Sequence, residues 1–130
     1  GTGQLEQESG KSLGHLVNVA GRQRMLSQRL AKYSYASVAG IERPAAQAEI
    51  GKARTEFLAG MKTLTEAPEA TPRIRDQLKL GEQQWVFFDA ALQASQKGTA
   101  TPEALSHVLT TSENILTVLN DVTGLYAALG

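Results

Sequence analysis

Residues 18–32 read NVAGRQRMLSQRLAK, the densest run of basic and amide side chains in the chain. Apolar side chains recur in it every three or four residues, which is the period of a helix with one buried face. A second line at the same spacing carries a glycine, an arginine and a glutamine. The stretch therefore predicts a helix with two distinct faces, and the rest of the chain indicates what each face contacts.

The composition limits the possible functions. With 130 residues the chain is long enough for one domain with one core. Its 13 basic and 13 acidic side chains balance, which argues against a nucleic-acid binder, because that function needs a surplus of basic residues. The sequence has no cysteine, which excludes disulfides and thiolate metal sites. No run approaches the roughly 18 apolar residues of a membrane-spanning helix.

The two ends of the sequence look incomplete. Gly1-Thr2-Gly3 resembles a remnant of cloning, and no signal peptide is recognisable. We therefore expect the natural protein to extend beyond both ends, with residues 1–130 forming a single domain.

Four prolines divide the chain into four segments of helix-forming residues. The residue before a proline is disfavoured in a helix, so Pro44 separates the first two segments. Thr71-Pro72 and Thr101-Pro102 each place a capping side chain before a proline at the first helical position. Gly98 is a typical helix stop. The predicted helices are about 5–39, 44–66, 72–96 and 102–129.

Each predicted helix has an apolar seam with alternating steps of three and four residues. Such seams are typical of an all-α, antiparallel up-down-up-down four-helix bundle with short loops. In that arrangement both termini lie at one end of an elongated domain. The seams are Leu16, Val19, Gln23, Leu26, Leu30 and Tyr33; Ile50, Ala53, Phe57, Met61 and Leu64; Ile74, Leu78, Gly81, Trp85, Phe88, Leu92 and Ser95; and Leu105, Val108, Ser112, Ile115, Leu119, Val122, Tyr126 and Leu129.

The first helix carries a second seam, nearly opposite the apolar one at about 100° per residue. A glycine in a helix interior costs roughly 1 kcal/mol of helix stability relative to alanine. Its lack of a side chain is useful only where another backbone approaches closely. We therefore expect this face to pack against the first helix of a second copy across a two-fold axis, forming a homodimer. The interface would comprise Gly10, Gly14, Val17, Gly21, Arg24, Gln28 and Tyr35, with Ala31 on the same line.

Arg24 lies in the middle of this predicted interface. In a parallel pair it faces its own copy, and at about 7 Å and an effective dielectric of about 20 the two charges repel by roughly 2 kcal/mol. A small planar oxyanion between the guanidinium groups would remove the repulsion. Gly21, one turn away, leaves room for it. Asn18, Met25 and Gln28 lie on adjacent turns, where the amides could donate further hydrogen bonds.

Other interpretations of these side chains remain open. A charged stripe on a helix is most often a solvated face, and it is the glycines that favour an interface. Arg22 and Arg29 are interpreted as surface charges or as ion-pair partners of acidic residues on the second and fourth helices. Met25 could pack in the interface without touching a ligand.

The sequence carries no catalytic, phosphate-loop or metal-ligand pattern, so we expect neither an enzyme nor a cofactor. His15 and His107 are isolated histidines without converging ligands. Trp85, with the phenylalanines that follow it, is interpreted as core and core border.

The run from Asn18 to Lys32 resembles the signature of PilJ-type sensor domains, the periplasmic parts of bacterial methyl-accepting chemotaxis receptors. Ala20-Gly21 followed by Arg24-Met25 is also similar to a motif in nitrate/nitrite sensor kinases. The resemblance implies a four-helix bundle that dimerises along its first helix and binds nitrate there. It implies that Arg24 is the anion-binding arginine with Gly21 beside it, and that Asn18 is a candidate contact. It also implies a membrane-anchored protein with flanking membrane helices.

Two other functions fit the same residues. The domain could be a dimerisation or protein-interaction module without a small ligand, since the glycine seam would serve that role equally. It could also be a receptor domain for another small anion, an organic acid or an amino acid, bound near the ends of the helices farthest from the membrane.

Overall fold

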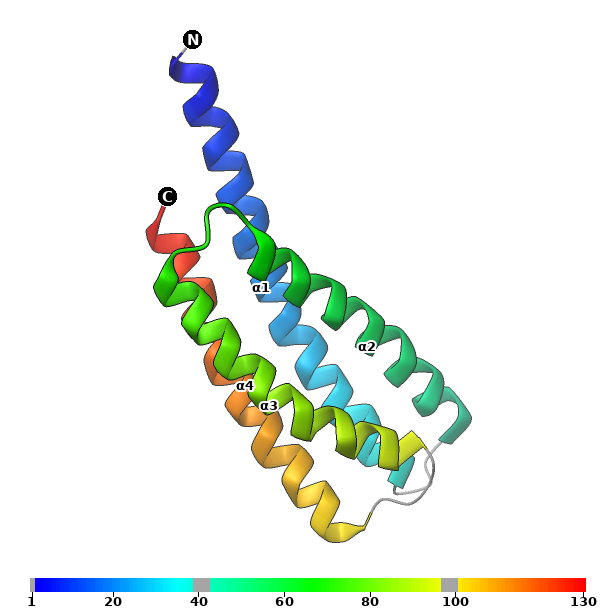
Figure 1. Ribbon diagram of the computed structural model, residues 1–130. Helices are drawn as coiled ribbons and strands as arrows, with labels where there is room; N and C mark the ends of the chain where they lie inside the picture. Colours follow the sequence, from blue (N-terminus) through cyan, green and yellow to red (C-terminus); the bar gives the residue numbers. More distant parts are fainter. Residues whose placement is uncertain (1, 39–42, 97–100) are drawn as a thin grey trace.

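The computed structural model describes residues 2–38, 43–96 and 101–130, with side chains at 12–37, 44–94, 101–103 and 106–130. These residues form four helices and, within those ranges, no strand (Figure 1). The helices are α1 (Thr2–Val38), α2 (Arg43–Glu66), α3 (Pro72–Gln96) and α4 (Pro102–Ala128). The predicted end of the first helix near residue 39 and the predicted stop at Gly98 lie outside the described residues.

The predicted start of α3 is confirmed in detail. Thr71 precedes the helix, and its Oγ1 accepts a hydrogen bond of 3.2 Å from the backbone N–H of Ile74. Its carbonyl accepts the first helical bond, 3.0 Å from the N–H of Arg75. This is the geometry of an N-cap, with Pro72 at the first helical position, where a missing N–H does no harm. α4 likewise begins at Pro102 and has Glu103 in its first turn.

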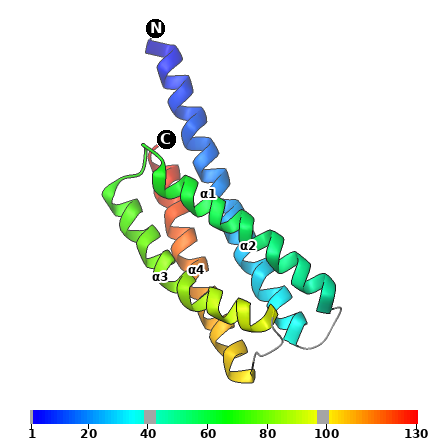
Figure 2. The ribbon, with the colours of Figure 1, turned by 45° about the vertical axis from the view of Figure 1, so that its right-hand side comes forward.

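Contacts between distant residues fix the direction of the helices. Ser12 near the start of α1 donates to Glu69 just after α2, and Gln23 farther along α1 contacts Phe57 earlier in α2, so the two helices are antiparallel. Arg24 contacts Asn120, which joins α1 to α4. Figures 1 and 2 show consecutive helices running in opposite directions, with both termini at one end. The N-terminal part of α1 extends past the other three helices.

The core is built from the predicted seams. Nearly all of their described members are buried, including every predicted residue of α2. Val19, Tyr33 and Trp85 are half-buried, whereas Leu105 and Ser95 lie outside the described side chains. The assignment of Leu129 to the core is wrong, because its side chain is 43% exposed. It follows Ala128, the last residue of α4, so the helical period no longer sets the direction of its side chain.

Gln23 is a buried amide within the apolar seam of α1. Its Nε2 donates a hydrogen bond of 2.6 Å to the carbonyl of Phe57 on α2, and its carboxamide lies over Gly60, where an added Cβ would overlap it. A buried amide needs such a partner, because an unsatisfied one is costly. The pair therefore fixes how α1 and α2 sit along each other.

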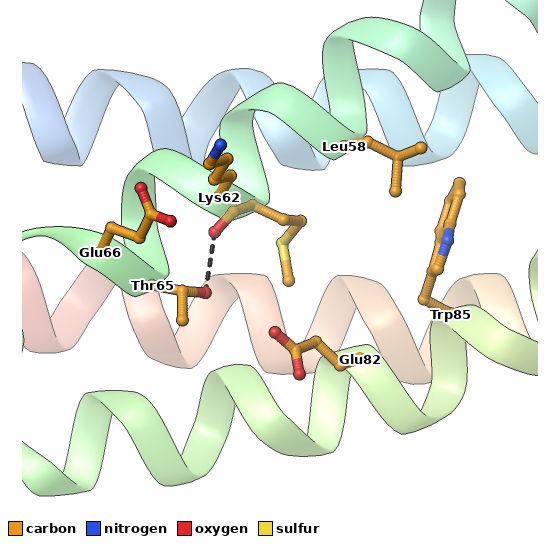
Figure 3. A pocket seen from close by; sticks show the side chains of 7 residues that line it. Leu58, Lys62, Thr65, Glu66, Glu82 and Trp85 are labelled. Carbon is orange, nitrogen blue, oxygen red and sulfur yellow. Dashed lines mark hydrogen bonds between the residues drawn. The ribbon is translucent and has the colours of Figure 1, made fainter.

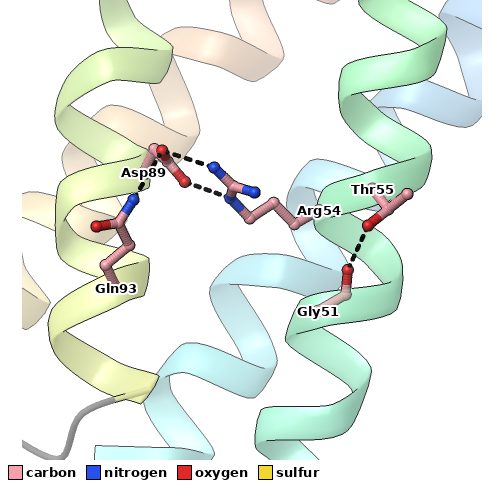
Figure 4. Close-up of polar contacts among 5 residues, drawn as sticks. All are labelled: Gly51, Arg54, Thr55, Asp89 and Gln93. Atoms are coloured by element: carbon pink, nitrogen blue, oxygen red, sulfur yellow. Dashed lines mark hydrogen bonds and ion pairs between the residues drawn. The ribbon is translucent and has the colours of Figure 1, made fainter.

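α2 and α3 are tied near one end by an ion pair (Figure 4). Arg54 donates through Nε and Nη2 to the two carboxylate oxygens of Asp89, at 2.6 and 3.0 Å. Gln93 also donates to Asp89. The hydrogen bond and the charge of this carboxylate raise the pKa of Arg54, against the effect of burial. Deeper in the bundle, Trp85 stacks on Phe57 with ring centroids 4.6 Å apart.

None of the helices described is long and apolar enough to cross a membrane.

Candidate functional site

Arg24 projects from the middle of α1 and lies back along its own helix. Its Nη1 donates a hydrogen bond of 2.7 Å to Oδ1 of Asn120 on α4. A Cβ built on Gly21 would lie 3.8 Å from its Nη2 and within 4 Å of no other group apart from neighbouring atoms of the helix. The guanidinium group therefore spans from α4 on one side to the bare backbone of Gly21 on the other.

The charge of Arg24 is not neutralised by an acid. Among the described side chains the ion pairs are Arg54–Asp89 and Arg22–Glu56, the second with a distance of 2.6 Å. Arg22 thus pairs with an acidic residue of the second helix, one of the roles expected for it, while Arg29 is exposed. Arg24 instead meets a neutral amide oxygen. A cation paired only with an amide keeps its attraction for an anion.

An open hollow of about 340 Å³ surrounds this guanidinium group. It contains four of the five predicted ligand-binding residues, and α4 contributes two residues that sequence reasoning missed. Asn18 is exposed and does not line it. The lining residues are Gly21, Arg24, Met25, Gln28, Leu116 and Asn120.

The predicted dimer face of α1 is more exposed than the apolar seam. Gly14 and Tyr35 are exposed, Val17 is half-buried, and the side-chain environment of Gly10 lies outside the described residues. An added Cβ at Gly14 would meet nothing within 4 Å, so packing inside this chain does not require a glycine there. Gly51 on α2 and Gly124 on α4 are equally unobstructed. The interface itself stays a prediction.

A second hollow, of about 370 Å³, lies between α2 and α3 (Figure 3). Leu58 and the indole ring of Trp85 bound one end, and Glu66 lies at the other. Its two carboxylates, Glu66 and Glu82, outnumber its single ammonium group, Lys62. The negative balance makes it a poor site for an anion.

A third hollow, of about 570 Å³, lies between α3 and α4 toward the end of the bundle opposite the termini. Phe87, His107 and several alanines line it, without arginine or lysine. Its lining residues therefore offer an anion no permanently charged cation to pair with. Within the described residues no three potential ligand side chains gather around a possible metal position.

Comparison with known protein families assigns this chain to one of them. Residues 7–111 match the PilJ family, described as the N-terminal part of type IV pili methyl-accepting chemotaxis transducers. The chain belongs to this family. The PilJ domain is therefore the sensor part of a chemotaxis transducer, a domain that binds a ligand and catalyses no reaction.

A solved structure has the same fold as this PilJ domain. The ligand-binding domain of the P. aeruginosa nitrate receptor McpN superposes with a TM-score of 0.75 at 24% sequence identity. The match covers 86% of this chain and 93% of that one. Curated protein sequences gave no significant match. The all-α four-helix fold expected from the seams is thus confirmed.

Proposed function

We propose that this PilJ domain is the periplasmic nitrate sensor of a membrane-anchored chemotaxis receptor and acts as a homodimer along α1. The observation that carries the proposal is Arg24, a cation without an acidic partner among the described side chains, set over a bare glycine on the open face of α1. The likeness to a domain of a nitrate receptor supports the choice of anion.

The proposed mechanism uses the repulsion between two identical cations. Without anion, the two Arg24 side chains oppose association of the α1 helices. Nitrate is planar, carries one charge and offers three oxygens, so each guanidinium group can take it by a two-bond edge. Because nitrate binds the associated α1 helices more tightly than the separated ones, binding shifts the population toward the associated state. This change in the arrangement of the two α1 helices is the signal.

The membrane side of the proposal rests on the position of the termini. The ends of α1 and α4 lie together at one end of the bundle. Flanking membrane helices would meet the domain at that end, and a change in the α1 pair would reach them directly.

The test is calorimetry with nitrate, chloride and sulfate on the wild type, Arg24→Ala and Arg22→Ala. Arg22 is the matched control, because it lies two residues away but pairs with Glu56. We expect nitrate binding in the wild type and in Arg22→Ala, and its loss in Arg24→Ala. Undiminished binding in Arg24→Ala would reject the proposal.

Sedimentation with and without nitrate tests the dimer. We expect nitrate to increase association, and chloride to do so less. A dimer that ignores nitrate would favour the ligand-free dimerisation module. Thermal stabilisation by organic acids instead of nitrogen oxyanions would favour a receptor for those compounds.

A further inference from the structure

We propose that Asn120 on α4 is a positioning residue for the anion site: it holds the guanidinium group of Arg24 so that the edge formed by Nε and Nη2 is free to take the anion. This inference rests on the proposed function and adds a residue of another helix to it. It follows from how the two ends of the guanidinium group are engaged.

The contacts of Arg24 leave one edge unused. Nη1 is engaged by Asn120, while Nη2 lies near Gly21, 3.8 Å from the place where a Cβ would stand. The hydrogen bonds of the described residues leave Nε and Nη2 without an acceptor. This pair of nitrogens forms the same edge with which Arg54 grips both oxygens of Asp89 in this structure. A planar oxyanion has the matching spacing.

The chemistry of an asparagine suits this position. An arginine can only donate, so the Oδ1 atom of Asn120 must face it and the Nδ2 amide points elsewhere. The amide oxygen holds the guanidinium group and leaves its positive charge in place, whereas the carboxylate of an aspartate would neutralise that charge. Asn120 lines the hollow, and its Nδ2 amide is a donor that could serve a further oxygen of the anion.

The contact also links the ligand to α4. Arg24 and Asn120 belong to helices whose ends lie together at one end of the bundle. An anion that draws Arg24 toward a second copy pulls on a hydrogen bond anchored in α4. Ligand binding would therefore exert a force on α1 and, through this hydrogen bond, on α4.

The variants are Asn120→Ala and Asn120→Asp, with Asn114→Ala as the matched control. Asn114 is also an exposed asparagine of α4, but it donates to Gln84 on α3, away from the site. Nitrate affinity should fall about tenfold in Asn120→Ala, the size expected for one hydrogen bond to a charged group. Asn120→Asp should lose more, because the new carboxylate pairs with Arg24. Asn114→Ala should stay within about twofold of the wild type.

Anion selectivity separates positioning from general support of the fold. A spherical chloride ion needs no oriented edge, so its affinity should change less than that of nitrate in Asn120→Ala. Equal losses for both ions would overturn the inference, as would nitrate binding by Asn120→Ala at wild-type strength. If the wild type binds nitrate and Arg24→Ala does not, the proposed function survives that outcome. If the wild type binds no oxyanion, both fall.

Discussion

Gln23 and Gly60 illustrate how one buried amide constrains its neighbour. In Gly60→Ala the new Cβ would overlap the carboxamide of Gln23, which must then give up its bond to Phe57. Losing that buried bond costs about 1–3 kcal/mol, whereas alanine in the helix returns roughly 1 kcal/mol. We expect a net destabilisation of up to about 2 kcal/mol in urea unfolding. In a Gln23→Ala background the same substitution should stabilise.

Gly51 provides the control for this prediction. It lies on the same helix, and an added Cβ there meets nothing within 4 Å. Gly51→Ala should therefore stabilise the wild type by about 0.5–1 kcal/mol through helix propensity alone. If Gly60→Ala stabilised the wild type to the same degree, the amide contact would not constrain this helix pair.

Tyr126 predicts how stability depends on alkaline pH. Its hydroxyl donates to the carbonyl of Leu64 at 2.7 Å, and burial, aided by the charge of Glu69, raises its pKa. The folded state therefore keeps the proton after the unfolded chain has begun to lose it near pH 10. Stability from this group is complete below about pH 10 and is lost as pH rises toward the folded pKa.

Tyr126→Phe should lower stability by about 1 kcal/mol at neutral pH and flatten the decline above pH 10. Unfolding measured from about two pH units below to about 1.5 above the reference tyrosine pKa of roughly 10 would test this. Tyr35→Phe, which removes a hydroxyl from a side chain that is 53% exposed, should keep the wild-type slope. An unchanged slope in Tyr126→Phe would contradict the assignment.

The residues of the candidate site differ in how far sequence could reveal them. Gly21, Arg24 and Gln28 are three or four positions apart on one helix, so their shared hollow was predictable. Asn120 lies 96 positions from Arg24, and finding it required the register between α1 and α4. A helical period says which face a residue is on, but it does not say which residue of another helix lies opposite.

At the level of helices, two ion pairs with the same short distance should contribute differently to the stability of the fold. Arg54–Asp89 and Arg22–Glu56 both have a distance of 2.6 Å, but the carboxylate side chains are 18% and 47% exposed. Asp89→Asn should destabilise by about 1–2 kcal/mol, because it also loosens the tie between α2 and α3. Glu56→Gln should change stability by less than about 0.5 kcal/mol.

Urea unfolding of both variants at low and high salt measures the difference. The small effect of Glu56→Gln should shrink further in high salt, which screens exposed charges. Equal effects of the two substitutions would show that burial does not distinguish the pairs.

Helix boundaries were the most predictable feature at this scale. The prolines and the Thr71 cap act locally, so α3 begins where the sequence indicated. The pairing of α2 with α3 was not predictable, since Arg54 and Asp89 lie on different helices and either could have been a solvated charge. Seams reveal which residues are buried, while lateral contacts depend on how the helices are rotated.

At the scale of the whole molecule, the proposed dimer can be tested with a substitution that should raise the stability of the monomer but weaken its association into a dimer. Gly14→Leu adds a helix-forming side chain where the chain itself offers no obstacle. The monomer should gain up to about 1 kcal/mol, whereas the nitrate-linked dimer should weaken because the helices can no longer approach. Thermal unfolding and sedimentation measure the two effects.

Gly51→Leu on α2 is the control, with the same gain and no loss of association. A dimer unaffected by Gly14→Leu would remove α1 from the interface. The glycine spacing on α1 could suggest this contact, but a single sequence cannot specify a partner's geometry.

The length of α1 has a mechanical consequence. The helix has 37 residues, against 24 to 27 for the other three, and its first turns stand clear of them (Figure 2). A solitary helical stretch of about ten residues is marginal in water, and it spans roughly 15 Å. In the proposed dimer the same stretch of the second copy would lie beside it, and we expect this contact to stabilise the stretch as a helix and to make it stiffer.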